Sequence, residues 1–250
     1  IEDGSYNIFI GQTAGNKTKD ADNNIFFGLD SGRCQTGPSN IAFGKTALVG
    51  SSTATDNTGE NNIALGEDAL RALTSGKYNL AIQKGALYDL TTGCYNISFG
   101  LHSGANSVDN KYSIYIGASA GCDRTTGDYN IAIGKNALQG SGTADGEYNI
   151  AIGALAGECQ STGDHNIFLG TYAGEQQTTL VDNVFVGSQA GRCNRGNDNV
   201  AIGKGALVGS STASNNVGTA NVAIGNGAGK ALTSGCCNIM LGINAGCELT

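Results

Sequence analysis

Eight cysteines and two histidines are the residues in this chain with the most chemistry to offer. Zinc sites need about four clustered ligands, but no two cysteines form a Cys-x-x-Cys pair, and His102 and His165 lie far apart in the chain. Serine is abundant, yet neither histidine has a recurring acidic partner that would activate a nucleophile. The sequence therefore predicts no metal site, no cofactor and no enzyme activity.

A short repeat determines which elements carry these residues. It reads Asn, apolar, small or aromatic, apolar, Gly, two variable residues, Ala, then Gly or Leu, as in residues 130–138. It occurs fourteen times, usually 17 residues apart, with steps of 16, 19 and 22 as variants. A fixed period of this kind is typical of a solenoid whose coils pair through parallel strands. We predict an all-β fold, a parallel β-solenoid of 14 coils forming one domain over residues 1–250.

A longer repeat contains the short one. Residues 1–91 match residues 160–250 at an offset of 159, and the steps of 17, 16, 22 and 17 from Asn7 recur from Asn166. The octapeptide at 47–54 is identical to that at 206–213. The block has therefore been duplicated. Long connectors, at 49–61, 139–148 and 208–220, are expected to protrude from one edge.

The residue that begins each repeat is asparagine in thirteen of the fourteen copies, and Ser113 takes its place in the other. Stacked amides can hydrogen-bond from coil to coil, so we predict a structural ladder rather than a ligand site. Its members are Asn7, Asn24, Asn40, Asn62, Asn79, Asn96, Asn130, Asn149, Asn166, Asn183, Asn199, Asn221 and Asn238.

The apolar triplet after the asparagine predicts a short strand. Its first and third residues are apolar in every repeat, so we expect them to line the coil interior, and the middle residue to face the other way. The middle residue is also apolar or aromatic in thirteen repeats, which predicts that another copy of the chain covers it. The large members of this predicted subunit interface are Phe9, Phe26, Tyr115, Phe168, Phe185 and Met240.

Tyrosine precedes the leading residue in five consecutive repeats, at Tyr78, Tyr95, Tyr112, Tyr129 and Tyr148. These rings are expected to stack as an aromatic ladder at the coil spacing. Two interpretations stay open: a packed seam, favoured because stacked aromatic pairs are stabilising, and an exposed row that binds sugar faces.

The cysteines occupy two positions in the repeat. Five follow the leading residue by nine or ten positions, and Cys94 and Cys236 precede it by two. Cysteines in the same position never fall on adjacent coils, and coils two apart are about 10 Å apart, beyond disulfide reach. Free thiols and bridges between chains both remain open; Cys236, Cys237 and Cys247 are the candidates for interchain bridges.

Composition excludes some partners. The net charge is −7 with no basic run, so nucleic-acid binding is unexpected. No run approaches the ~20 apolar residues that span a bilayer, and no signal peptide is recognisable.

Val222-Ala223-Ile224-Gly225 and the same motif at 131–134 resemble the N-S-V-A-I-G head repeats of trimeric autotransporter adhesins. Similar N-x-A-I-G-x-x-A-L repeats occur in phage tail fibres. The resemblance covers essentially the whole chain and implies a left-handed β-roll, a homotrimer around one axis, and an extracellular or virion fibre. The repeats here are longer than the adhesin head repeats, which favours a viral fibre or another appendage.

We therefore expect a non-enzymatic fibre or adhesin shaft that gives rigid reach and multivalent attachment to a host glycan or receptor. The alternative is a purely structural subunit of an extracellular filament in which rods stack head to tail. A monomeric solenoid with an ice- or sugar-binding face is a third hypothesis, disfavoured because no Thr-x-Thr row is present.

Overall fold

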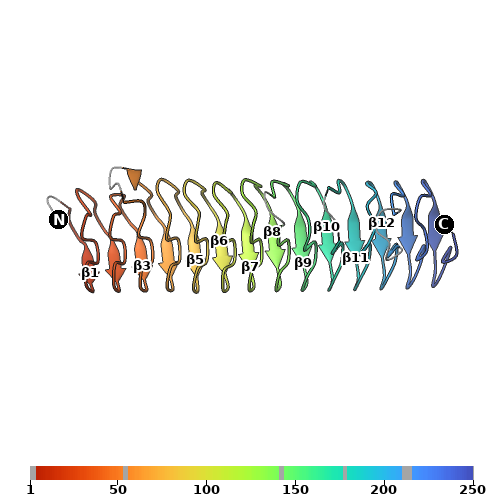
Figure 1. Cartoon of the computed structure of the whole chain (residues 1–250), viewed down its shortest axis with the longest axis horizontal. Helices are drawn as coiled ribbons and strands as arrows, with labels where there is room; N and C mark the ends of the chain where they lie inside the picture. Colours follow the sequence, from red (N-terminus) through yellow and green to blue (C-terminus); the bar gives the residue numbers. More distant parts are fainter. Residues whose placement is uncertain (1–3, 53–55, 141–143, 177–178, 210–215, 250) are drawn as a thin grey trace. The chain divides into compact units, whose positions relative to one another are not determined.

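The chain folds into stacked coils, each of which contributes one three-residue strand. The computed structural model describes residues 4–52, 56–140, 144–176, 179–209 and 216–249, so parts of the three long connectors lie outside the described residues. Its contacts divide the chain into two compact units, residues 1–127 and 128–250. Within each unit, successive coils lie side by side in chain order (Figure 1).

The first unit contains β1 (Ile8–Ile10), β2 (Ile25–Phe27), β3 (Ile41–Phe43), β4 (Ile63–Leu65), β5 (Leu80–Ile82), β6 (Ile97–Phe99) and β7 (Ile114–Ile116). The second contains β8 (Ile131–Ile133), β9 (Ile150–Ile152), β10 (Ile167–Leu169), β11 (Val184–Val186), β12 (Val200–Ile202), β13 (Val222–Ile224) and β14 (Ile239–Leu241). These fourteen strands, about 17 residues apart, confirm the predicted all-β parallel β-solenoid.

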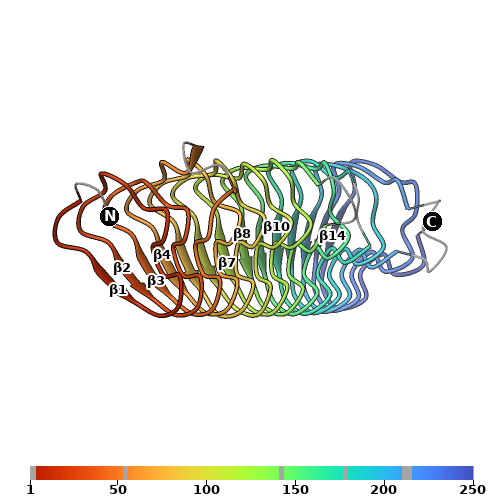
Figure 2. The same ribbon diagram turned by 60° about the vertical axis from the view of Figure 1, so that its left-hand side comes forward.

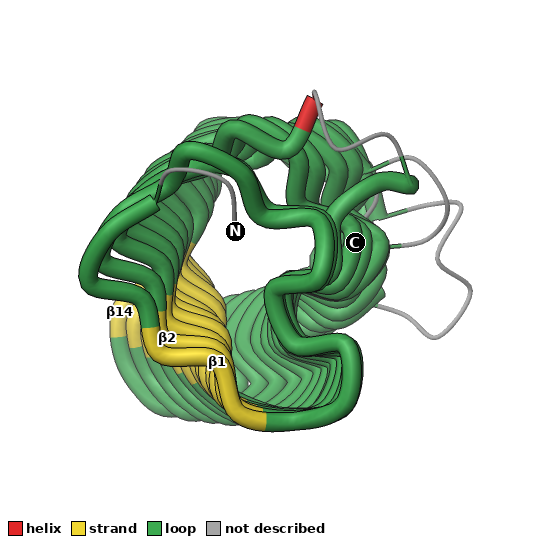
Figure 3. The backbone as a smooth tube through the Cα atoms, turned by 90° about the vertical axis from the view of Figure 1, so that its left-hand side faces the viewer, coloured by secondary structure: helices red, strands yellow, loops and turns green. Residues whose placement is uncertain are grey.

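Neighbouring strands within each unit pair in parallel and in register. Ile8 lies opposite Ile25 and Phe9 opposite Phe26, and the same correspondence continues through β7 and again from β8 to β14. In each unit the strands form one wall, and turns complete the coil (Figures 2 and 3). One face of this wall therefore points into the coil and the other points outward.

The residue after each strand is glycine in thirteen of the fourteen coils because it makes a corner that a side chain would block. Gly28 has φ +134°, a conformation that other residues rarely adopt, and a β-carbon there would lie 2.6 Å from the carbonyl oxygen of Gly44. Gln83 is the exception, with φ +90°. The corners of successive coils thus stack backbone on backbone.

Each coil turns further at three left-handed residues. They are the residue before the leading Asn or Ser, and the second and fourth residues after the corner. In the coil of β5 these are Tyr78 (φ +58°), Gly85 (φ +65°) and Leu87 (φ +50°). A bulky residue in this region costs about 1–2 kcal/mol, so Leu87 and its equivalents must regain that energy by packing.

The middle residue of each strand and the fourth residue after the corner fill the coil interior together. Where the middle residue of the strand is Phe, Tyr or Met, the fourth residue after the corner is Gly, because a side chain would collide with the large residue. A β-carbon at Gly32, for example, would lie 2.3 Å from Cδ2 of Phe26. Where the fourth residue after the corner is Leu, as at Leu48, the middle residue of the strand is Ala, as at Ala42. Ala42, Leu48 and Phe26 are all fully buried. The two positions exchange volume within one coil.

Three coils have small residues at both positions, and each lies between a Leu coil and a coil with a large strand residue. In the coil of β6, the positions are Ser98 and Gly104, and a β-carbon at Gly104 would lie 2.6 Å from Leu87 Cδ2 and 2.7 Å from Tyr115 Cδ2. The coils of β9 and β13 repeat this arrangement, with Leu138 and Phe168, and Leu207 and Met240, leaning in from either side. Among these coils, a spacer stands wherever a Leu coil is followed by a coil with a large strand residue, whereas the reverse change, as from Phe26 to Leu48, takes place between adjacent coils.

Candidate functional site

The outer face of the strand wall is apolar and accessible. It is formed by the first and third residues of every strand, all of which are Ile, Val, Leu or Phe; we call these the outer rows. None of these residues is fully buried in the described chain. Among inner coils of the first unit, Phe27 is 48% exposed, Phe43 43%, Ile97 42% and Phe99 46%. An apolar sheet face of this kind needs a cover.

The predicted subunit interface was wrong because the alternation of the strand was assigned the wrong way round. Phe26, Tyr115, Phe168 and Phe185 have no exposed surface, Met240 is 4% exposed, and Phe9 is half-buried in the first coil. These rings fill the interior of their own chain and stack there, with 5.0 Å between the ring centroids of Phe9 and Phe26. The outer rows were expected to line the interior, but in the structure they form the accessible apolar face of the wall.

The asparagine row forms a buried hydrogen-bonded ladder within each unit. The backbone N–H of each member donates to Oδ1 of the member one coil earlier at 2.8–3.0 Å. In most coils Nδ2 donates to a carbonyl of the following turn, as from Asn79 to Gly93 at 2.8 Å, whereas Nδ2 of Asn183 donates to the carbonyl of Val181. Asn24 departs from this pattern because its Nδ2 has no partner. Between its terminal members the ladder is at most 1% exposed, so its role is structural.

The tyrosines stack face to face. Ring centroids are 4.9 Å apart for Tyr78 and Tyr95 and 5.0 Å for Tyr95 and Tyr112, with planes within 10°. In the second unit Tyr129 stacks on Tyr148, and His165, which the sequence analysis did not place in this row, continues the stack at 5.1 Å.

The tyrosines are 44–48% exposed, but neighbouring rings cover the faces that a sugar would stack on. The accessible part is the ring edge with its hydroxyl, so the geometry fits the packed seam and not the sugar platform. Each of these tyrosines also has positive φ, as does the residue before the leading Asn or Ser in every coil. Stacking therefore offsets backbone strain along the row.

All eight cysteines are free thiols in the chain. Cys34, Cys122 and Cys193 are buried, whereas Cys236 and Cys237 are adjacent and exposed. Burial, together with the nearby Asp123 carboxylate, raises the pKa of Cys122 to about 12, and the hydrogen bond that the Cys237 thiol donates to Cys236 raises the pKa of Cys237. A raised pKa keeps a thiol protonated and slow to react.

Within the described ranges, no group of three or more His, Cys, Asp and Glu side chains is placed to hold a metal ion. No helix among the described residues has the length and apolar character needed to cross a membrane. Comparison of the chain with family models, with curated proteins and with solved structures finds no match.

Proposed function

We propose that this chain is a non-enzymatic shaft segment of an extracellular or virion fibre, assembled by self-association through the outer rows. The observation that carries the proposal is the exposed aliphatic wall on a coil whose interior is already filled by its own side chains. Rigid reach comes from the buried asparagine ladder and the register of the strands, which leave the coil few ways to bend.

The size of the wall supports a stable interface. Each unit has seven strands and therefore fourteen outer-row side chains. If each leaves about 60 Å² accessible, one unit presents about 800 Å² of apolar surface, which is the area per partner in a standard protein–protein interface. The largest apolar patch on an ordinary monomer is only about 300–600 Å².

A second copy of the chain is the occupant that this wall fits best. Two such walls carry rows of similar shape at the same spacing of about 4.8 Å, so they can interdigitate like the sheets of a β-sandwich. The outer rows carry no charge that would demand a complementary partner. The resemblance to trimeric adhesin heads favours three copies around one axis and a left-handed coil, and several copies would attach to a host surface multivalently.

Sedimentation velocity and chemical cross-linking at micromolar concentration test the proposal. We expect the wild-type chain to sediment with three times the 25.3 kDa of one chain. The double variant Ile97→Glu/Phe99→Glu places carboxylates on the wall and should sediment as a monomer with an unchanged circular dichroism spectrum.

Val108→Glu is the matched control because the exposed fraction of Val108, 42%, equals that of Ile97, but Val108 lies outside the strands. This variant should assemble as the wild type does. A wild-type chain that is monomeric at these concentrations, or a double variant that still assembles, would refute self-association through the outer rows.

A further inference from the structure

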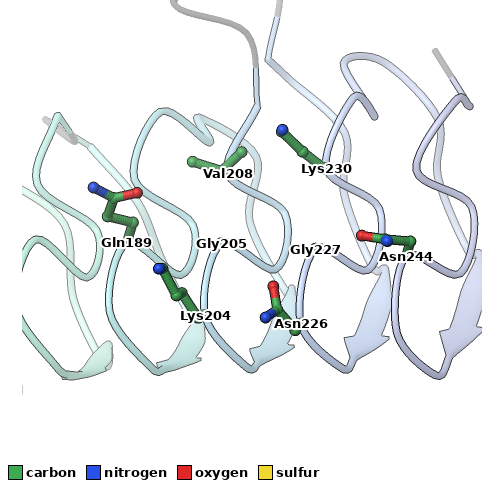
Figure 4. A pocket seen from close by; sticks show the side chains of 8 residues that line it. All are labelled: Gln189, Lys204, Gly205, Val208, Asn226, Gly227, Lys230 and Asn244. Carbon is green, nitrogen blue, oxygen red and sulfur yellow. The ribbon is translucent and has the colours of Figure 1, made fainter.

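A groove in the second unit has no part in the proposed assembly. It has a volume of about 260 Å³ and crosses the coils that carry β11 to β14. Its polar lining consists of two lysines, Lys204 and Lys230, and three side-chain amides, from Gln189, Asn226 and Asn244. Figure 4 shows these side chains around the backbone at Gly205 and Gly227.

Neither lysine of the groove has an ion-pair partner in the part of the chain that the structure describes: no carboxylate there lies within ion-pair distance of the ammonium group of Lys204 or Lys230. None of the eight residues that line the groove is acidic. An adjoining groove has an acidic residue, Glu248, in its lining and shares Lys230 with this groove.

The duplicated block supplies an internal comparison. At an offset of 159, Lys204 and Lys230 correspond to Lys45 and Arg71, so both blocks keep the cations. The first block pairs them: Lys45 Nζ lies 3.8 Å from Glu67, and Arg71 Nε lies 3.4 Å from Asp68. Arg71 also lies over the ring of Tyr88 at 5.3 Å.

The second block has lost these partners. Asn226 stands where the first block has Glu67, and Gly227 stands where it has Asp68. Thr46, which donates to Asp68 at 2.7 Å, is replaced by Gly205, so the space that this pair fills is open. Gln189 replaces Asp30. Positions 30, 45, 67, 68 and 71 of the first block carry a net charge of −1, whereas the equivalent positions 189, 204, 226, 227 and 230 carry +2.

We propose that this groove binds the acidic group of a carbohydrate, a carboxylate or sulfate carried on a sugar. The two ammonium groups attract the anion, and the three amides can donate to and accept from sugar hydroxyls. The groove holds a unit of monosaccharide size. The chain-wide charge of −7 leaves no extended basic surface for a polyphosphate backbone.

Binding of fluorescent oligosaccharides, followed by fluorescence anisotropy, tests the site. The probes are a heparin octasaccharide as the sulfated arm, a hyaluronan octasaccharide as the carboxylated arm, and a neutral dextran oligosaccharide. We expect the wild-type chain to bind at least one acidic probe and not the neutral one. The variant Lys204→Met/Lys230→Met should lose at least tenfold in affinity.

Lys135 is the matched control because it is exposed and follows its corner glycine as Lys204 does, outside the groove. Lys135→Met should bind as the wild type does. Equal loss in this variant would mean diffuse electrostatic attraction and would overturn the site, as would failure of the wild type to bind either acidic probe.

Two exchanges between the blocks make the test stricter. Asn226→Glu/Gly227→Asp restores the carboxylates of the first block and should abolish binding. A β-carbon at position 227 would lie 2.5 Å from Oδ1 of Asn244, so the end of that side chain must turn aside, and circular dichroism checks that the variant folds. Glu67→Asn/Asp68→Gly should create a second binding site in the first unit. If neither exchange changes the affinity for the acidic probes, the proposal is refuted. This result does not depend on what sedimentation shows about self-association.

Discussion

The exchange of volume between two core positions yields a quantitative prediction for the coil of β3. Ala42→Phe places a ring where the β-carbon of Leu48 lies, and the equivalent contact in the coil of β2 would be 2.3 Å. We expect this overpacking to cost about 3 kcal/mol or more. Leu48→Gly removes a fully buried side chain, a loss of about 2–5 kcal/mol, offset by about 1 kcal/mol because Leu48 has φ +52°.

The double variant Ala42→Phe/Leu48→Gly should recover most of the stability, because it reproduces the Phe26 and Gly32 arrangement of the preceding coil. We expect it to lie within about 1 kcal/mol of the wild type, which implies a coupling free energy of about 4 kcal/mol. Urea and thermal unfolding, followed by circular dichroism, measure the free energies of unfolding of the wild type, the two single variants and the double variant. Hydrogen exchange at β3 measures the local stability as well, because solenoids need not unfold in one step. Additive effects, or a double variant no more stable than Ala42→Phe, would refute the reasoning.

The same exchange one coil later is the control. Ala64→Phe/Leu70→Gly puts the large ring directly after the Leu48 coil, without the spacer that precedes Tyr115, Phe168 and Met240. This double variant should remain at least about 2 kcal/mol less stable than the wild type, because the new ring collides with Leu48 and no spacer coil separates the two side chains. Equal rescue in both coils would show that spacer coils carry no energetic weight.

Two further predictions concern buried polar groups. Asn166→Ala should lower the free energy of unfolding by about 3 kcal/mol, because it strands the buried N–H of Asn183 and leaves the carbonyl of Leu180 with only a long hydrogen bond from Gln160 Nε2, at 3.5 Å. A urea titration that gives less than about 1 kcal/mol would contradict a ladder that matters for stability. Burial raises the pKa of Cys122 to about 12 from 9.0, so the folded chain retains this proton after the unfolded chain has lost it, and the stabilisation present below pH 9 decreases as pH rises. Between about pH 8 and about pH 10.5, the wild type should lose about 2 kcal/mol more stability than Cys122→Ala; parallel stability curves for the two proteins would contradict the assigned burial.

The repeat by itself determined the fold. A recurring Asn seventeen residues apart must occupy the same place in every coil, so strand positions, parallel pairing and the buried amide row follow from periodicity alone. The glycine after each strand was readable too, since Gly28 and its equivalents stack at corners that exclude a β-carbon.

Only the tertiary structure decided which face of the strand is inside. All three strand positions are apolar, so alternation allowed two solutions, and the sequence analysis chose the wrong one for Phe26 and its equivalents. Only one residue of each strand points into the coil. The sequence signal that identifies it is its inverse relation in size to the fourth residue after the corner: Ala42 occurs with Leu48, and Phe26 occurs with Gly32. The groove at Lys204 and Lys230 also required the structure, because its charge and openness arise from side chains of successive coils that only folding brings together.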